Sequence, residues 1–189
     1  MIAAVYLTKH HNQFRLEFYM KKTIATILIL ISLVLSFSGC INTTALPKEM
    51  PDDFTFYVSW GYSGSYYDSA TGELRKRSGD KFVTTYIMTE DELEVIYNII
   101  REMKIESFDD ILSYSDVQGL YGCSPCMTVS ISVKAGEVDR TVTAEKIPGF
   151  SAGQTRKGKR YLKAVKEIVD ILEATEEWKS LPPDTSGVN

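Results

Sequence analysis

Apolar side chains recur at every second position near the start of the region after residue 52. Phe54, Phe56, Val58 and Trp60 alternate with smaller or more polar residues, which is the pattern of a strand with one buried face. Further short strands are predicted on either side of a turn and after it, at 66–69, 74–77 and 82–88, with the turn at 70–73. This part of the chain therefore predicts a β-meander.

The next pattern has helical spacing. Thr89 and Glu92 form a T-x-x-E capping box, and the spacing predicts a helix over about 90–104 whose apolar face consists of Leu93, Ile96, Tyr97, Ile100 and Met103. A second pair of strands is expected in Met127–Val133 and Val138–Ala144, with the turn at Gly136. A closing helix has the apolar face Tyr161 or Leu162, Val165, Ile168, Val169 and Leu172.

This order of elements predicts an α+β fold, an antiparallel sheet of about five to six strands with two helices packed on one face. We expect one domain over 53–176, after a spacer at 40–52 and before a flexible tail at 177–189. In layout alone, the pattern resembles small extracytoplasmic domains of unknown function found in prokaryotic lipoproteins, a resemblance that implies no functional residues.

Residues 1–39 have a different pattern. Lys21 and Lys22 precede an apolar stretch over 23–37 that is followed by Ser38, Gly39 and Cys40, the arrangement of a secretory signal peptide. Met20 fits as the translation start, which would make residues 1–19 an upstream annotation artefact. Met20 to Cys40 resembles the signal and lipobox of prokaryotic lipoproteins, with Phe37 where that family usually carries Leu, Val or Ile.

The lipoprotein resemblance implies that Cys40 receives acyl chains and becomes the mature N-terminus. The chain would then be held on the extracytoplasmic face of a cell membrane, and two acyl chains suffice for stable attachment. The alternative is an uncleaved transmembrane anchor, although the apolar stretch is shorter than the roughly 20 residues of a spanning helix.

The composition of residues 40–189, the part expected to be exported, excludes several classes of function. Removing residues 1–39 takes away four of 21 basic and one of 25 acidic residues, and leaves a net charge of −7. This charge disfavours nucleic acid as a partner. Both histidines, His10 and His11, are also removed, which excludes a Ser-His-Asp triad, Cys-His catalysis and histidine-based zinc sites. We expect neither a cofactor nor a metal.

Cys123 and Cys126 form a C-x-x-C motif. In an oxidising compartment a structural disulfide is the default expectation. A redox dithiol is the alternative, but such a motif usually begins a helix, and here a strand is predicted next. Zinc would need carboxylate ligands such as Asp109, Asp110 or Asp116, which cluster after the first helix but lack the calcium-loop spacing. A turn or capping role for these aspartates is the simpler interpretation.

Two further segments are candidates for binding. One is a loop in which aromatic residues are interspersed with Gly and Ser; the aromatic residues are Trp60, Tyr62, Tyr66 and Tyr67. Such a loop is suited to stacking on a sugar or contacting a protein. The alternative is that these rings pack within the fold. The other is a basic cluster at the start of the closing helix, which consists of Arg156, Lys157, Lys159 and Arg160 and is a candidate anion site. The alternative is that these side chains form a solvated face of the helix.

The basic cluster lies within a partial P-loop spacing from Gly153 to Lys159. Arg160 stands where the P-loop needs a hydroxyl, so a nucleotide hydrolase is not favoured. The sequence thus favours a lipid-anchored, non-catalytic binding or scaffolding domain with an envelope protein or a glycan as partner. The competing classes are an envelope enzyme that uses Cys123 and Cys126 or carboxylates, and a purely structural lipoprotein.

Overall fold

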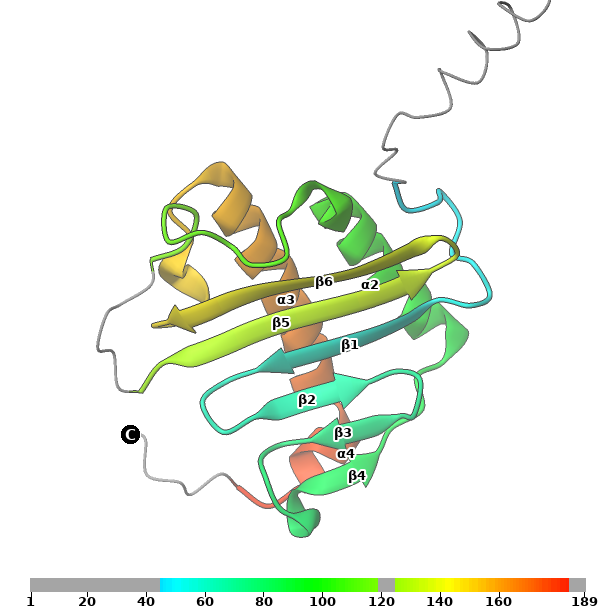
Figure 1. Ribbon diagram of the computed structural model, residues 1–189. Coiled ribbons are helices and arrows are strands. Elements are labelled where there is room, and N and C mark those ends of the chain that lie inside the picture. Colours follow the sequence, from blue (N-terminus) through cyan, green and yellow to red (C-terminus); the bar gives the residue numbers. More distant parts are fainter. Residues whose placement is uncertain (1–44, 119–124, 184–189) are drawn as a thin grey trace, which may run out of the picture. The chain divides into compact units, whose positions relative to one another are not determined.

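The first strand of the chain lies in the middle of the sheet. The computed structural model describes residues 45–118 and 125–183, and its six strands follow the order β4-β3-β2-β1-β5-β6 with every neighbouring pair antiparallel (Figure 1). The strands are β1 Thr55–Trp60, β2 Ser65–Asp68, β3 Glu73–Arg75, β4 Val83–Thr85, β5 Met127–Ala135 and β6 Val138–Ile147.

The described residues also form three α-helices, α2 Glu90–Met103, α3 Arg156–Ala174 and α4 Glu176–Ser180, with short 3-10 turns at Asp80–Phe82, Ile105–Ser107 and Phe150–Ala152. The two long helices contact one another and lie behind the sheet in the view of Figure 1. The predicted α+β fold, with an antiparallel sheet and two main helices, is therefore confirmed. None of the helices in the described ranges is both long enough and apolar enough to span a bilayer.

The alternation in β1 produces the buried side of the sheet. Phe56, Val58 and Trp60 are buried, whereas the residues between them are half-buried. The same rule applies in β5, where Met127, Val129, Ile131 and Val133 enter the core. Because α2 and α3 cover only this side, the apolar residues of each strand face the helices and the intervening residues face away.

Both long helices begin at a threonine cap. The Thr89 side chain accepts a hydrogen bond from the Glu92 backbone N–H, and the Glu92 carboxylate accepts one from Thr89, which confirms the capping box. In α3 the Thr155 hydroxyl caps the helix by accepting from Gly158 N–H. The whole predicted apolar face of α3, including both Tyr161 and Leu162, is buried.

Tyr161 joins α3 to the sheet. Its hydroxyl is fully buried and lies 2.7 Å from the Val142 carbonyl and 3.2 Å from the Val129 carbonyl. Burial in this apolar setting raises the pKa of the Tyr161 phenol far above its ordinary value, so the group stays protonated and donates. The contact fixes the helix against the two longest strands.

The structure differs from the expected spacer. Leu46 is only 7% exposed and belongs to the core, the Tyr97 hydroxyl donates to the Pro47 carbonyl at 2.7 Å, and Arg101 donates to the Lys48 carbonyl. We call residues 46–51 the N-terminal strap. An apolar side chain and two backbone acceptors hold this strap on α2, so it is part of the domain.

The domain also extends past the expected boundary at 176. The short helix α4 begins at a Thr175 cap and places Trp178 in the core at 8% exposure, with its ring 5.3 Å from that of Trp60. Leu181 is buried as well. The part of the tail beyond 183 lies outside the described residues.

Candidate binding surface

The side of the sheet that faces away from the helices carries polar side chains in rows across the strands. One row runs through the partners Val83, Arg75, Tyr66, Ser59, Ser130 and Thr143, and a second through Thr85, Glu73, Asp68, Tyr57, Ser132 and Thr141. Lys134 pairs with Thr55 and with Asp139. Directly paired residues share a face, so these side chains form one surface, which we call the open face.

An aromatic and charged cluster occupies the centre of the open face. The rings of Tyr57 and Tyr66 lie 5.4 Å apart. The Tyr66 hydroxyl donates to the Glu73 carboxylate, and Arg75 binds both groups, with Nη2 2.8 Å from Glu73 and Nε 3.1 Å from the Tyr66 oxygen. Four side chains from three adjacent strands thus hold one another in place.

The electrostatics of this cluster keep the carboxylate charged. The hydrogen bond from Tyr66, together with Arg75, lowers the pKa of Glu73 below its ordinary value. Partial burial raises the pKa values of the Tyr57 and Tyr66 phenols, so both hydroxyls remain protonated at neutral pH. The cluster therefore presents an anion, a cation and two hydroxyl groups at fixed positions.

The β5 and β6 side of the open face is rich in hydroxyl groups. Ser130 bonds Thr143 at 2.9 Å, and Ser132 bonds Thr141 at 2.8 Å. Beyond them the surface falls into a depression of about 410 Å³ at the edge of β6, lined by Asp110, Ile111, Asp139, Arg140, Thr141 and Thr143. Its size lies in the range of ligand sites, and Ile111, 59% exposed, gives it an apolar wall.

The four predicted aromatic residues do not form one surface. Trp60 is in the core, where its Nε1 donates to the Glu173 carboxylate at 2.9 Å, and Tyr67 is buried with its hydroxyl on the Tyr86 carbonyl. Burial raises the pKa of Tyr67 to about 12. Tyr66 belongs to the open face, and Tyr62 is exposed beside Pro148. Of the four aromatic residues predicted to bind a ligand, only Tyr62 and Tyr66 therefore remain candidates.

Two of the four cations in the predicted anion site already have partners. Lys157 pairs with Asp109 at 2.8 Å, and Arg160 donates to the Ser107 hydroxyl and lies over the Phe108 ring. Arg156 and Lys159 are exposed. Lys157 and Arg160 therefore hold the 105–110 segment against α3, and the four cationic side chains do not point to one common site.

The aspartates after the first helix also have structural roles. Asp109 pairs with Lys157, a contact that lowers its pKa, and Asp110 pairs with Arg140 at 3.1 Å. Asp116 accepts from the Thr155 hydroxyl at 2.7 Å and so brings a carboxylate to the N-terminus of α3. Within the described ranges, no three His, Cys, Asp or Glu side chains lie close enough together to hold a metal ion.

Packing explains the glycines of the partial P-loop spacing. A Cβ on Gly158 would lie 1.9 Å from the Asp116 carbonyl oxygen, and one on Gly153 would lie 2.7 Å from the Lys159 backbone. Gly158 is needed because the 113–117 segment packs closely on α3, and Gly153 is needed because its own loop lies against the first turn of α3. The spacing therefore reflects helix packing.

The C-x-x-C motif is described only in part. Of the two cysteines only Cys126 lies within the described residues, so the disulfide to Cys123 stays a prediction. Strand β5 begins directly after Cys126. In the described part of this motif there is thus no helix N-terminus to stabilise a Cys126 thiolate, a feature on which redox dithiols rely. Cys40 and the lipobox also lie outside the described residues.

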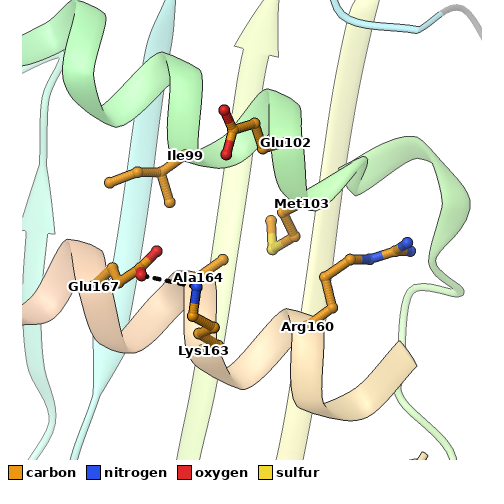
Figure 2. A pocket seen from close by; sticks show the side chains of 7 residues that line it. All are labelled: Ile99, Glu102, Met103, Arg160, Lys163, Ala164 and Glu167. Atoms are coloured by element: carbon orange, nitrogen blue, oxygen red, sulfur yellow. Dashed lines mark ion pairs between the residues drawn. The ribbon is translucent and has the colours of Figure 1, made fainter. Parts of the chain in front are cut away.

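A second, smaller hollow lies between α2 and α3. Figure 2 shows its floor of Ile99, Met103 and Ala164, with Glu102, Arg160, Lys163 and Glu167 around it. Its volume is about 130 Å³, below the roughly 300 Å³ of small ligand sites. Lys163 and Glu167 pair with each other at 3.2 Å. This hollow is a helix–helix groove with an ordinary charged rim.

Sequence reasoning missed Tyr57, Glu73 and Arg75. The alternation of apolar and polar residues in β1 puts Tyr57 on the side of the sheet opposite to Phe56, so the sequence did contain a signal that Tyr57 faces away from the core. Glu73 was assigned to a turn, but the turn ends at Gly72, where φ is 72° and a Cβ would lie 2.3 Å from Ile87. Only the pairing of β2 with β3 brings Arg75 beside Tyr66.

The chain matches no protein-family model and no curated protein. The residues of the open face are therefore the basis for its proposed function.

Proposed function

We propose that this chain is a lipid-anchored envelope protein whose single domain is a non-catalytic binding module. The signal and lipobox pattern ending at Cys40 supports the anchor. The observation that carries the binding role is the open face, on which Tyr57, Tyr66, Glu73 and Arg75 hold one another in fixed positions without contributing to the core.

The chemistry of the open face favours a glycan as the ligand. Tyrosine rings offer flat surfaces for the C–H faces of sugars, and the serine and threonine hydroxyls both donate and accept hydrogen bonds. Its acidic residues Asp68, Glu73 and Asp139 are nearly balanced by Arg75 and Lys134. Such a surface suits an uncharged, hydroxyl-rich polymer better than a nucleic acid or an apolar helix.

Binding to insoluble cell-wall polysaccharide from the source organism, measured by co-sedimentation, tests the proposal. We expect Tyr66→Ala and Arg75→Ala each to weaken binding at least tenfold. A matched control is Lys163→Ala, which removes an exposed cation from the helix side. Equal binding by all variants would contradict the role of the open face, and capture of an envelope protein in place of polysaccharide would favour the protein partner.

A thiol-exchange enzyme is the competing proposal. Free Cys123 and Cys126 thiols in the working protein would favour it. Alkylation before and after reduction, read by intact mass, detects such thiols, because a disulfide blocks alkylation until it is reduced.

A further inference from the structure

The chain enters the domain along a fixed path. Leu46 is in the core, and both Pro47 and Lys48 accept hydrogen bonds from α2. At the other end of the N-terminal strap, Phe54 N–H donates to the Pro51 carbonyl at 3.0 Å. The segment between Cys40 and the first fixed side chain is therefore only residues 41–45.

Covalent geometry limits how far this short tether can reach. An extended chain spans at most about 3.6 Å per residue, so the Cα atoms of Cys40 and Leu46 are no more than about 22 Å apart. A lipid on Cys40 lies at the membrane surface. The strap must then lie near that surface as well.

The strap lies at one identifiable end of the sheet. The Gly136 N–H in the turn between β5 and β6 donates to the Asp53 carboxylate at 2.9 Å, and Figure 1 shows the cyan strap beside this turn. We call the strap together with residues 135–138 the tethered pole. Strand β1 starts at this pole, and β5 ends there.

We infer that the tethered pole faces the lipid headgroups, an orientation that rests on the proposed lipid anchor at Cys40. Strands β1, β5 and β6 then run outward from the membrane. At about 3.3 Å per residue, β1 extends about 20 Å and β5 about 30 Å. Tyr62, in the turn beyond β1, lies at the far end, and the open face stands side-on to the surface, where a long polymer has access to it.

Within the described residues, the tethered pole carries no large exposed apolar side chain that could insert into a bilayer. The large exposed apolar side chains in the described ranges are Tyr62, Ile87, Val95, Ile111 and Tyr114, and none belongs to this pole. Its exposed residues include Lys48, Glu49 and Glu137. The short tether, and not an apolar patch, is what holds this pole near the membrane.

Photo-crosslinking from the membrane tests the orientation. The lipidated mature protein, which begins at Cys40, is extracted and reconstituted into phosphatidylethanolamine and phosphatidylglycerol vesicles that contain a benzophenone-headgroup lipid. The vesicles are irradiated, and the cross-links are mapped by mass spectrometry. We expect cross-links at Lys48 and Glu137 to exceed those at Tyr62 severalfold. A Gly-Ser insertion between Asn42 and Ala45 that triples the tether should bring the ratio near one, whereas the same insertion after Pro183 should leave it unchanged.

The outcomes separate the orientation from the anchor. Equal cross-linking at Lys48 and Tyr62, in protein whose intact mass includes the acyl chains, would overturn the orientation and leave the anchor standing. An intact mass without acyl chains, with no retention on vesicles, would overturn the lipid anchor and with it the orientation.

Discussion

The two sides of the sheet differ most clearly at neighbouring residues of the same strand. Phe56 is 2% exposed and packs in the core, whereas Tyr57 belongs to the open face and lies beside the Tyr66 ring. The helix-covered side is apolar, and the open face carries hydroxyls, carboxylates and cations. Alternate positions of one strand therefore separate stability from the proposed binding, and substitutions on one side should leave the other largely intact.

The largest expected difference comes from truncating these two neighbours. Phe56→Ala should lower the free energy of unfolding by about 3–5 kcal/mol, because it leaves a cavity in the core. Tyr57→Ala should cost only about 1 kcal/mol or less, through lost cross-strand contact. Urea denaturation followed by circular dichroism measures both. Similar losses for the two variants would mean that the open face also stabilises the fold.

Removing one phenolic hydroxyl from each side of the sheet tests the same difference at a single polar group. Tyr161→Phe removes the donor that serves the Val129 and Val142 carbonyls, and we expect a loss of about 1–3 kcal/mol, since buried acceptors are left without a partner. Tyr66→Phe is the matched change on the open face, where water can replace the phenol, and should stay within about 0.5 kcal/mol. Thermal or urea unfolding distinguishes the two. A larger loss of unfolding free energy for Tyr66→Phe than for Tyr161→Phe would contradict the assignment of the Tyr66 hydroxyl to the solvent-accessible open face.

The covering helix α2 depends on its capping box. Glu92→Ala should destabilise the protein by about 1 kcal/mol, because the backbone N–H of Thr89 loses its acceptor. Glu94→Ala, an exposed change two residues along the same helix, should have an effect within about 0.5 kcal/mol. Equal effects in urea unfolding would show that helix charge, and not the cap, is responsible.

The smallest expected effects are those of pH on two glutamates. The Thr89 backbone N–H, with the Tyr86 and Thr89 hydroxyls, lowers the pKa of Glu92 below its ordinary 4.5, and Tyr66 with Arg75 does the same for Glu73. A pKa that is lower in the folded state adds stability that is present above about pH 4.5 and is lost as the pH falls through the folded value.

Unfolding free energies measured between about pH 3 and 6 should therefore fall on acidification, and Glu92→Gln should flatten that fall. Glu73→Gln should flatten it less, because the Glu73 side chain is 38% exposed and solvent weakens its contacts. If Glu73→Gln flattened the pH dependence more than Glu92→Gln, the open face would contribute more to the free energy of unfolding than its contacts indicate.

Elements with strong local signals could be predicted from the sequence. The capping box located the start of α2 at Glu90, and the turn at Gly136 located the β5–β6 hairpin, because both signals depend on residues close together in the chain. The expected strand at 82–88 is shorter than predicted, because only Val83–Thr85 forms β4, after a 3-10 turn that ends at Phe82. Neither the short helix α4 nor the strap could be found, since Trp178 and Leu46 are buried only by partners far away in sequence.

The candidate surface was only partly predictable for the same reason. Tyr66 was identified from its aromatic, glycine-rich loop, but Arg75 and Glu73 join it through strand register. Trp60 and Tyr67 shared that loop pattern and proved to be core residues. Composition indicates which side chains are suited to a ligand, whereas strand register decides which of them reach solvent.

The central place of β1 has a consequence for how the molecule is made. Ser59 pairs with Tyr66 a few residues later but also with Ser130, roughly 70 residues downstream. A chain that emerges N-terminus first can close the β1–β4 meander early, yet β1 keeps an unpaired edge until β5 has been synthesised. The aromatic and hydroxyl halves of the open face therefore meet only in this late, long-range step, and the proposed binding surface is complete only when the fold is.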